Sequence, residues 1–147
     1  MSLMNIFDIA GSGMSAQSVR LNTTASNIAN AESISSNTDE TYRSRQPIFA
    51  ARFQDAMGGG GFGGMQGVVQ AGQGVEVKGI VESDAALKMR YEPSHPYANE
   101  DGYVAYPNVN IVEEMTNMIS ASRSFQTNVD VMNSAKDMMK QVLSLGQ

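Results

Sequence analysis

The residues that could carry out chemistry are few and scattered along the chain. One histidine, His95, and no cysteine occur among its 147 residues. A lone histidine excludes histidine-paired metal sites, and the lack of cysteine excludes thiolate ligands, thiol nucleophiles and disulfides. A serine triad needs a base oriented by a carboxylate, for which only remote candidates exist. His95 stands between Ser94 and Pro96, so we interpret it as a residue that fixes a proline turn.

A glycine run matches a phosphate-binding pattern in form only. Gly58, Gly60 and Gly63 fit G-x-G-x-x-G, but a phosphate cradle follows a buried strand and opens a helix. Neither pattern flanks the run, and no Gly-Lys-Ser/Thr is present. We interpret residues 58–67 as a Gly-rich loop and predict neither a nucleotide nor another cofactor.

Two adjacent glutamates could be imagined as an acid/base pair. Glu113 and Glu114 lie in a helical pattern, where neighbouring side chains point about 100° apart instead of converging on one substrate. The other carboxylates that a catalytic pair would have to use are Glu76, Glu82, Asp84, Glu92, Glu100 and Asp101. We predict no catalytic, cofactor-binding or metal residues, and a protein that is not an enzyme.

Charge and hydropathy exclude further classes of protein. The net charge is −5 and no cluster of Lys and Arg is present, whereas nucleic-acid binding needs such clusters to neutralise phosphates. No apolar stretch approaches the roughly 18 residues of a membrane span. The N-terminus lacks the basic region and apolar run of a cleaved secretory signal, so we expect any export to use another route.

The elements that position the remaining residues are two long helices, one at each end of the chain. Residues 109–145 contain no Gly or Pro, and Asn110 followed by Glu113 has the form of a capping box. At about 1.5 Å per residue, such a helix spans on the order of 50 Å, which is too long for a small domain to cover. Alternate steps of four and three select the seam of a coiled coil. Its positions are Ile111, Met115, Met118, Ser122, Phe125, Val129, Met132, Lys136, Met139 and Leu143.

The N-terminal residues 5–31 repeat this pattern. Asn5 is a suitable helix cap, and Asp8 and Arg20 are the only charges. A face of short neutral side chains, among them Asn27 and Asn30, suits burial against another protein because no charge is desolvated. The heptad positions are Phe7, Ala10, Met14, Gln17, Leu21, Thr24, Ile28 and Ala31.

The middle of the chain shows short strand patterns. Residues 42–53 form an extended segment that Pro47 limits to a sheet edge, and alternation predicts strands near 75–82 and 87–91. Asp101-Gly102 predicts a turn before residues 103–106. The predicted fold is therefore mainly α with a small β-containing middle. Residues 1–31 and 109–147 would form a discontinuous antiparallel coiled-coil domain, and residues 32–108 a small domain that includes the Gly-rich loop.

Several segments resemble one known family. Residues 21–31, Leu-Asn-Thr-Thr-Ala-Ser-Asn-Ile-Ala-Asn-Ala, are similar to the N-terminal signature of flagellar rod, hook and hook-associated proteins. Residues 91–96, 102–110 and 113–128 resemble rod proteins of the basal body more specifically. Together these segments and the two helices cover well over half of the chain, whereas residues 32–57 and the Gly-rich stretch match loosely.

The resemblance implies a structural subunit of the rod that crosses the periplasm. In that family the two terminal helices pair as an antiparallel coiled coil that lines the inner tube, and subunits stack helically. The resemblance also implies export by the flagellar type III apparatus without signal cleavage. Expected partners are other rod proteins, copies of the chain itself, the adaptor at the rod base and the membrane ring beneath, with no nucleic acid and no small-molecule substrate.

Our hypothesis is therefore a subunit that assembles helically through its terminal helices, transmits torque and lines the export channel. The alternatives are a peptidoglycan-acting enzyme associated with the rod and a helical adaptor in a discrete hetero-oligomer. The predicted subunit and coiled-coil interface residues are Phe7, Met14, Leu21, Asn27, Ile28, Asn30, Ile111, Met115, Met118, Phe125, Val129, Met132, Met139 and Leu143.

Overall fold

The structure is a computed structural model that describes residues 3–35, 38–52 and 74–145. Its elements in chain order are α1 (Leu3–Ala29), β1 (Arg45–Ala51), β2 (Val75–Glu82), β3 (Lys88–Tyr91), β4 (Tyr103–Tyr106) and α2 (Ile111–Leu145). The predicted Gly-rich loop, residues 58–67, lies outside the described residues.

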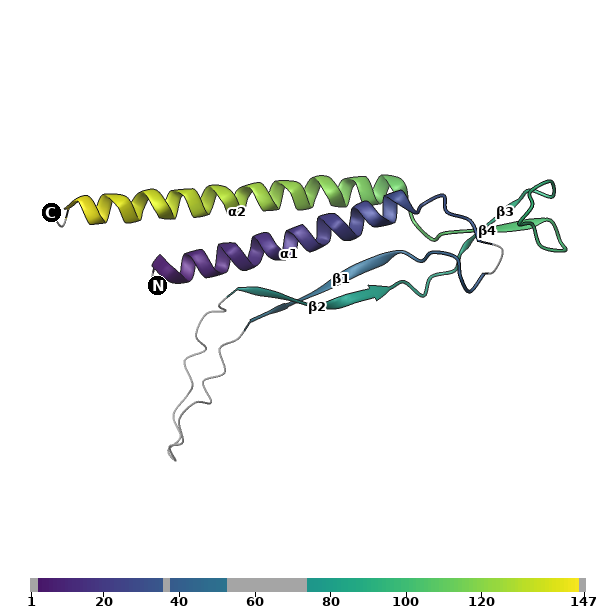
Figure 1. Cartoon of the computed structure of the whole chain (residues 1–147), viewed down its shortest axis with the longest axis horizontal. Coiled ribbons are helices and arrows are strands. Elements are labelled where there is room, and N and C mark those ends of the chain that lie inside the picture. Colours follow the sequence, from purple (N-terminus) through teal and green to yellow (C-terminus); the bar gives the residue numbers. More distant parts are fainter. Residues whose placement is uncertain (1–2, 36–37, 53–73, 146–147) are drawn as a thin grey trace, which may run out of the picture.

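The two helices dominate the fold, as the sequence predicts. They comprise 27 and 35 residues and lie side by side in opposite directions (Figure 1). Asn110 caps α2 through its side chain, because its Oδ1 accepts a hydrogen bond from the amide of Val112 at 3.3 Å. Asn110 is therefore the N-cap of α2, with its side chain on the N2 amide, whereas the predicted capping box would use the N3 amide of Glu113.

The β-containing middle consists of two separate antiparallel pairs. Strand β1 pairs with β2, and Pro47, which cannot donate a ladder hydrogen bond, lies opposite Ile80. The register shifts between Ile48 and Phe49, whose partners are Gly79 and Val77, so Lys78 is the extra residue of a bulge. Strand β3 pairs with β4 across residues 88–91 and 103–106.

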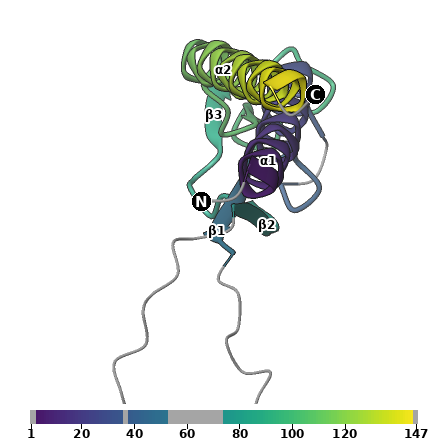
Figure 2. The same ribbon diagram turned by 90° about the vertical axis from the view of Figure 1, so that its left-hand side faces the viewer.

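The elements form three layers and a projecting tip. Helix α1 lies between α2 and the β1–β2 pair, as both views show (Figures 1 and 2). The β3–β4 pair extends beyond the end of the helices where α1 ends and α2 begins (Figure 1). A two-stranded ribbon is marginal alone in water, so the contact with α1 stabilises β1–β2.

The densest core lies where α1 ends and α2 begins. Its buried residues are Thr23, Thr24, Asn27, Ala31, Thr41, Ser44, Val104, Ala105, Pro107, Val109 and Glu114. Farther along the helix pair the buried side chains are alanines, namely Ala10, Ala16, Ala121 and Ala135. Within the described ranges, no helix is long and apolar enough to cross a membrane.

Candidate functional site

The face of α2 that packs on α1 is made of small and polar residues. The buried residues of α2 are Glu114, Ala121 and Ala135. Asn128, midway between the two alanines, lies against Gly13 of α1. These four residues of α2 therefore form a stripe that repeats every seven residues, as the contact positions of a helix pair do.

Short side chains allow this close approach of the helices. A Cβ atom on Gly13 would lie 2.9 Å from Asn128 Nδ2. Seven residues, or about two turns, farther along α1, the Arg20 guanidinium donates from Nη2 to Asn117 Oδ1 at 3.0 Å. The seam thus combines close packing of small residues with a polar contact, while large apolar side chains of both helices, such as Leu21 and Phe125, are half-buried.

Glu114 is a buried carboxyl at the start of α2. It is 6% exposed, and burial raises its pKa above the ordinary value because a charge is costly away from water. The neighbouring Glu113 raises the pKa further, while hydrogen bonds from Asn27 and Thr24 and the charge of Arg20 oppose the shift. Glu114 therefore joins α2 to the last turns of α1 without a close ion pair.

Asn27 is the centre of a polar joint between α1 and β1. Its side chain is 1% exposed. Oδ1 accepts hydrogen bonds from the Arg45 amide at 2.9 Å and the Tyr42 hydroxyl at 2.8 Å, and Nδ2 donates to the Arg45 carbonyl at 2.8 Å. The amide group thus replaces a neighbouring strand at the edge of β1.

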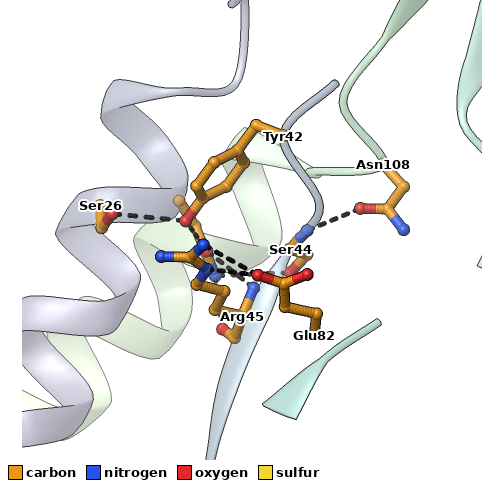
Figure 3. Close-up of polar contacts among 7 residues, drawn as sticks. Ser26, Tyr42, Ser44, Arg45, Glu82 and Asn108 are labelled. Carbon is orange, nitrogen blue, oxygen red and sulfur yellow. Dashed lines mark hydrogen bonds and ion pairs between the residues drawn. The ribbon is translucent and has the colours of Figure 1, made fainter. Parts of the chain in front are cut away.

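The approach to α2 reaches the same point from the other side. Asn108 Oδ1 accepts a hydrogen bond from the Ser44 amide at 2.7 Å, and its Nδ2 donates to the carbonyls of Ser83 and Ala85 at 3.3 and 3.0 Å. Figure 3 shows Asn108 and the side chains of α1 on opposite sides of Ser44 and Arg45. We call Ser26, Asn27, Tyr42, Ser44, Arg45, Glu82 and Asn108 the polar joint.

An ion pair covers the solvent side of this joint. Arg45 Nη2 lies 2.8 Å from Glu82 Oε1, across the first register position of β1 and β2. The guanidinium carbon also lies 5.4 Å from the centre of the Tyr42 ring. Since both charged side chains are about half exposed, solvent weakens the pair, and the buried amide contacts of Asn27 carry more of the stability.

The structure places the predicted interface residues in three groups by exposure. Asn27 is buried and Ile111, Met115 and Leu143 are 38%, 54% and 68% exposed. The others are half-buried, namely Phe7, Met14, Leu21, Ile28, Asn30, Met118, Phe125, Val129, Met132 and Met139. Asn30 bonds within its own helix, where Nδ2 donates to the Ser26 carbonyl at 2.8 Å. Whether these residues form contacts between subunits stays a prediction.

Most large apolar side chains of α2 point to solvent in the single chain. The outer apolar surface of α2 comprises Ile111, Val112, Met115, Ile119, Val131, Met138, Val142, Leu143 and Leu145. The end of α2 extends beyond the start of α1 (Figure 1), and residues 140–145 are all exposed. These side chains form one group at residues 111–119 and another at residues 131–145, and the exposed positions between the two groups are polar. Exposed apolar groups of this kind favour association with other proteins.

Sequence reasoning missed the buried position of Glu114 and the part that Asn108 and Ser44 play in the polar joint. Glu114 entered only as half of a rejected acid/base pair, although its Thr24 and Asn27 partners lie far away in sequence. Nothing local marks Asn108 or Ser44 as partners, because their hydrogen bond joins positions 64 residues apart. The only signal in the sequence for the stripe of α2 that faces α1 was the pair Ala121 and Ala135, which lie 14 residues, or two heptads, apart.

Two family models match the ends of the chain. "Flagella basal body rod protein" matches residues 7–32, and "Flagellar basal body rod FlgEFG protein C-terminal" matches residues 100–145. These segments contain most of α1, strand β4 and all of α2.

In the described part of the chain, no group of three His, Cys, Asp or Glu residues is arranged to hold a metal ion.

Curated relatives match from end to end. The flagellar basal-body rod protein FlgC of Salmonella typhimurium is 48% identical, that of Yersinia enterocolitica 44% and that of Borreliella burgdorferi 37%. Each comparison covers the whole of this chain and at least 99% of the relative. These are structural rod proteins, which confirms the prediction that the chain is not an enzyme. The chain belongs to the FlgC family of flagellar basal-body rod proteins.

Proposed function

We propose that this rod protein assembles helically through its two terminal helices, paired as an antiparallel coiled coil. The observation that carries the proposal is the outer apolar surface of α2, which is exposed in the single chain. Burial of each such side chain by a neighbouring subunit would contribute roughly 1.5–3 kcal/mol to association. Examples are Val112, Met115 and Leu143. Contacts between non-identical surfaces of identical or similar subunits extend into open filaments when the rotation does not close.

We further propose that the assembled rod transmits torque across the periplasm and lines the export channel. Paired helices of about 40 and 50 Å, at 1.5 Å per residue, suit the stiff wall that these roles need. The partners are copies of this chain, other rod proteins, the adaptor at the rod base and the membrane ring. Export proceeds through the flagellar type III apparatus without a cleaved signal peptide. The helical ends would form one domain, and residues 32–108 the other.

A pair of charge substitutions tests the assembly surface. Met115→Glu and Leu143→Glu alter side chains that are 54% and 68% exposed, so the helix content of the isolated chain should match that of the parent. Both variants should fail to enter isolated basal bodies and fail to restore swimming to a strain that lacks the protein. The matched control is Asn133→Glu, at an exposed and polar position of α2 outside the predicted seam.

The outcomes separate the proposal from its rivals. Normal incorporation of both glutamate variants would reject α2 as the assembly surface. A parent chain that forms only a closed complex of fixed mass with its partners, measured by light scattering, would favour a discrete adaptor over a helical tube.

A further inference from the structure

The close packing of α2 on Gly13 does not by itself fix the register of the two helices. Ala121 and Ala135 are both fully buried and lie seven residues either side of Asn128, which faces Gly13. If α2 slipped by one heptad, an alanine would replace Asn128 opposite Gly13, and a smaller side chain would occupy the close contact. Such a slip moves α2 by about 10 Å and creates no clash at this position.

The polar joint, by contrast, holds both helices to two adjacent residues. Asn27 of α1 makes two hydrogen bonds to the backbone of Arg45, at 2.9 and 2.8 Å. Asn108, three residues before α2 begins, accepts from the backbone of Ser44 at 2.7 Å. A hydrogen bond is lost once donor and acceptor separate by a fraction of an ångström beyond about 3.2 Å, so a one-residue shift of either helix breaks this joint.

We infer that Ser44 and Arg45 set the register of α2 on α1, with Asn27 and Asn108 as the positioning residues. Asn108 also ties the carbonyls of Ser83 and Ala85 to the same point. The end of the β1–β2 pair is therefore fixed together with the two helices. This role concerns the chain itself and holds whether or not the helices mediate assembly.

The register is measured as a distance between spin labels. The chain has no cysteine, so Ser18→Cys on α1 and Asn133→Cys on α2, both exposed, place two labels on the pair. Pulsed electron paramagnetic resonance is recorded at a concentration where circular dichroism shows both helices formed. The parent should give one narrow distance, and Asn108→Ala should add a population displaced by about 10 Å, one heptad.

Two further variants make the result specific. Asn99→Ala removes another asparagine that accepts two backbone hydrogen bonds, from Asp101 and Tyr103, and should leave the distance unchanged. Asn108→Asp keeps the acceptor for Ser44 and should restore the single distance. The inference is overturned if Asn108→Ala keeps the narrow parental distance, if the parent is already spread over two registers, or if Asn108→Ala loses its helices altogether.

Discussion

Asn128 of α2 lies so close to Gly13 of α1 that a Cβ atom on the glycine would come within 2.9 Å of its amide nitrogen. A glycine at position 11, by contrast, has open space where its Cβ would be. Both glycines lie inside α1, and each weakens the helix by about 1 kcal/mol relative to alanine. Replacing Gly11 therefore measures only the cost of a glycine in a helix, whereas replacing Gly13 also measures the benefit of close packing between the helices.

Gly11→Ala should raise the free energy of unfolding by about 1 kcal/mol, the full difference in helix propensity. Gly13→Ala should gain less, because the Asn128 side chain must turn away from the new methyl group. Combining Gly13→Ala with Asn128→Ala should recover the missing part, as a double-mutant cycle followed by thermal unfolding at 222 nm would show. Equal gains at both glycines in the parent background would contradict the close packing of α2 on Gly13.

Glu114 predicts a stability that falls as pH rises. Its pKa is raised in the folded chain above the ordinary 4.5, so the folded state binds the proton more tightly than the unfolded state. The penalty for its charge is therefore absent below about pH 4.5, grows as pH rises through the folded pKa and is constant above it. Glu114→Gln should remove this contribution, seen as the difference in melting temperature from the parent between pH 4 and 8.

Glu113→Gln is the control for that titration. Glu113 is exposed, and its substitution should leave most of the pH dependence in place. The groups that face Glu114 are Thr24, Asn27 and Arg20 on α1. None of these groups is a carboxylate or histidine. If the melting temperatures of the parent and of Glu114→Gln change with pH in the same way, the Glu114 side chain is solvated in the folded chain.

The Tyr42 hydroxyl should contribute measurably to the polar joint. It donates to Asn27 Oδ1 at 2.8 Å and lies 3.3 Å from Ser26 Oγ. Tyr42→Phe removes these contacts but keeps the ring that lies beneath Arg45, and should lower the free energy of unfolding by about 1 kcal/mol. Tyr97→Phe, at an exposed position on the β3–β4 tip, should have no effect on thermal unfolding.

The helices and strands are predictable because their signals are local. Residues 5–31 and 109–145 carry a seven-residue repeat without proline, and the structure has helices at Leu3–Ala29 and Ile111–Leu145. The two alternating segments after Gly74 are strands within one residue of their expected limits, whereas the sequence predicts β4 only as the segment that follows a turn. Caps, alternation and periodicity all act within a few residues of the chain.

The polar joint and the orientation of the seam are not predictable in this way. A heptad repeat of apolar residues shows which side of α2 favours association with another helix. It does not show whether that helix is α1 of the same chain or belongs to another subunit. In the single chain α1 takes the stripe of Ala121, Asn128 and Ala135, while Met115 and Leu143 stay exposed. The partners of Asn27 and Asn108 depend on the tertiary fold, so one sequence does not reveal them.

A charge placed within the predicted interface should block assembly without unfolding the middle of the chain. Phe125 and Ile28 are half-buried on α2 and α1, and Phe125→Asp or Ile28→Asp would desolvate a carboxylate wherever a neighbour packs on them. Either variant should be absent from isolated basal bodies and leave cells non-motile, whereas Ser120→Asp, at an exposed position of α2, should assemble. The tyrosines, at positions 42, 91, 97, 103 and 106, all lie outside the helices. Tyr42 contacts α1 through Asn27, so the near-ultraviolet circular dichroism of the tyrosines reports the middle and its joint with α1, and it should be preserved. Basal bodies that contain either aspartate variant at the parental level would remove these two residues from the interface.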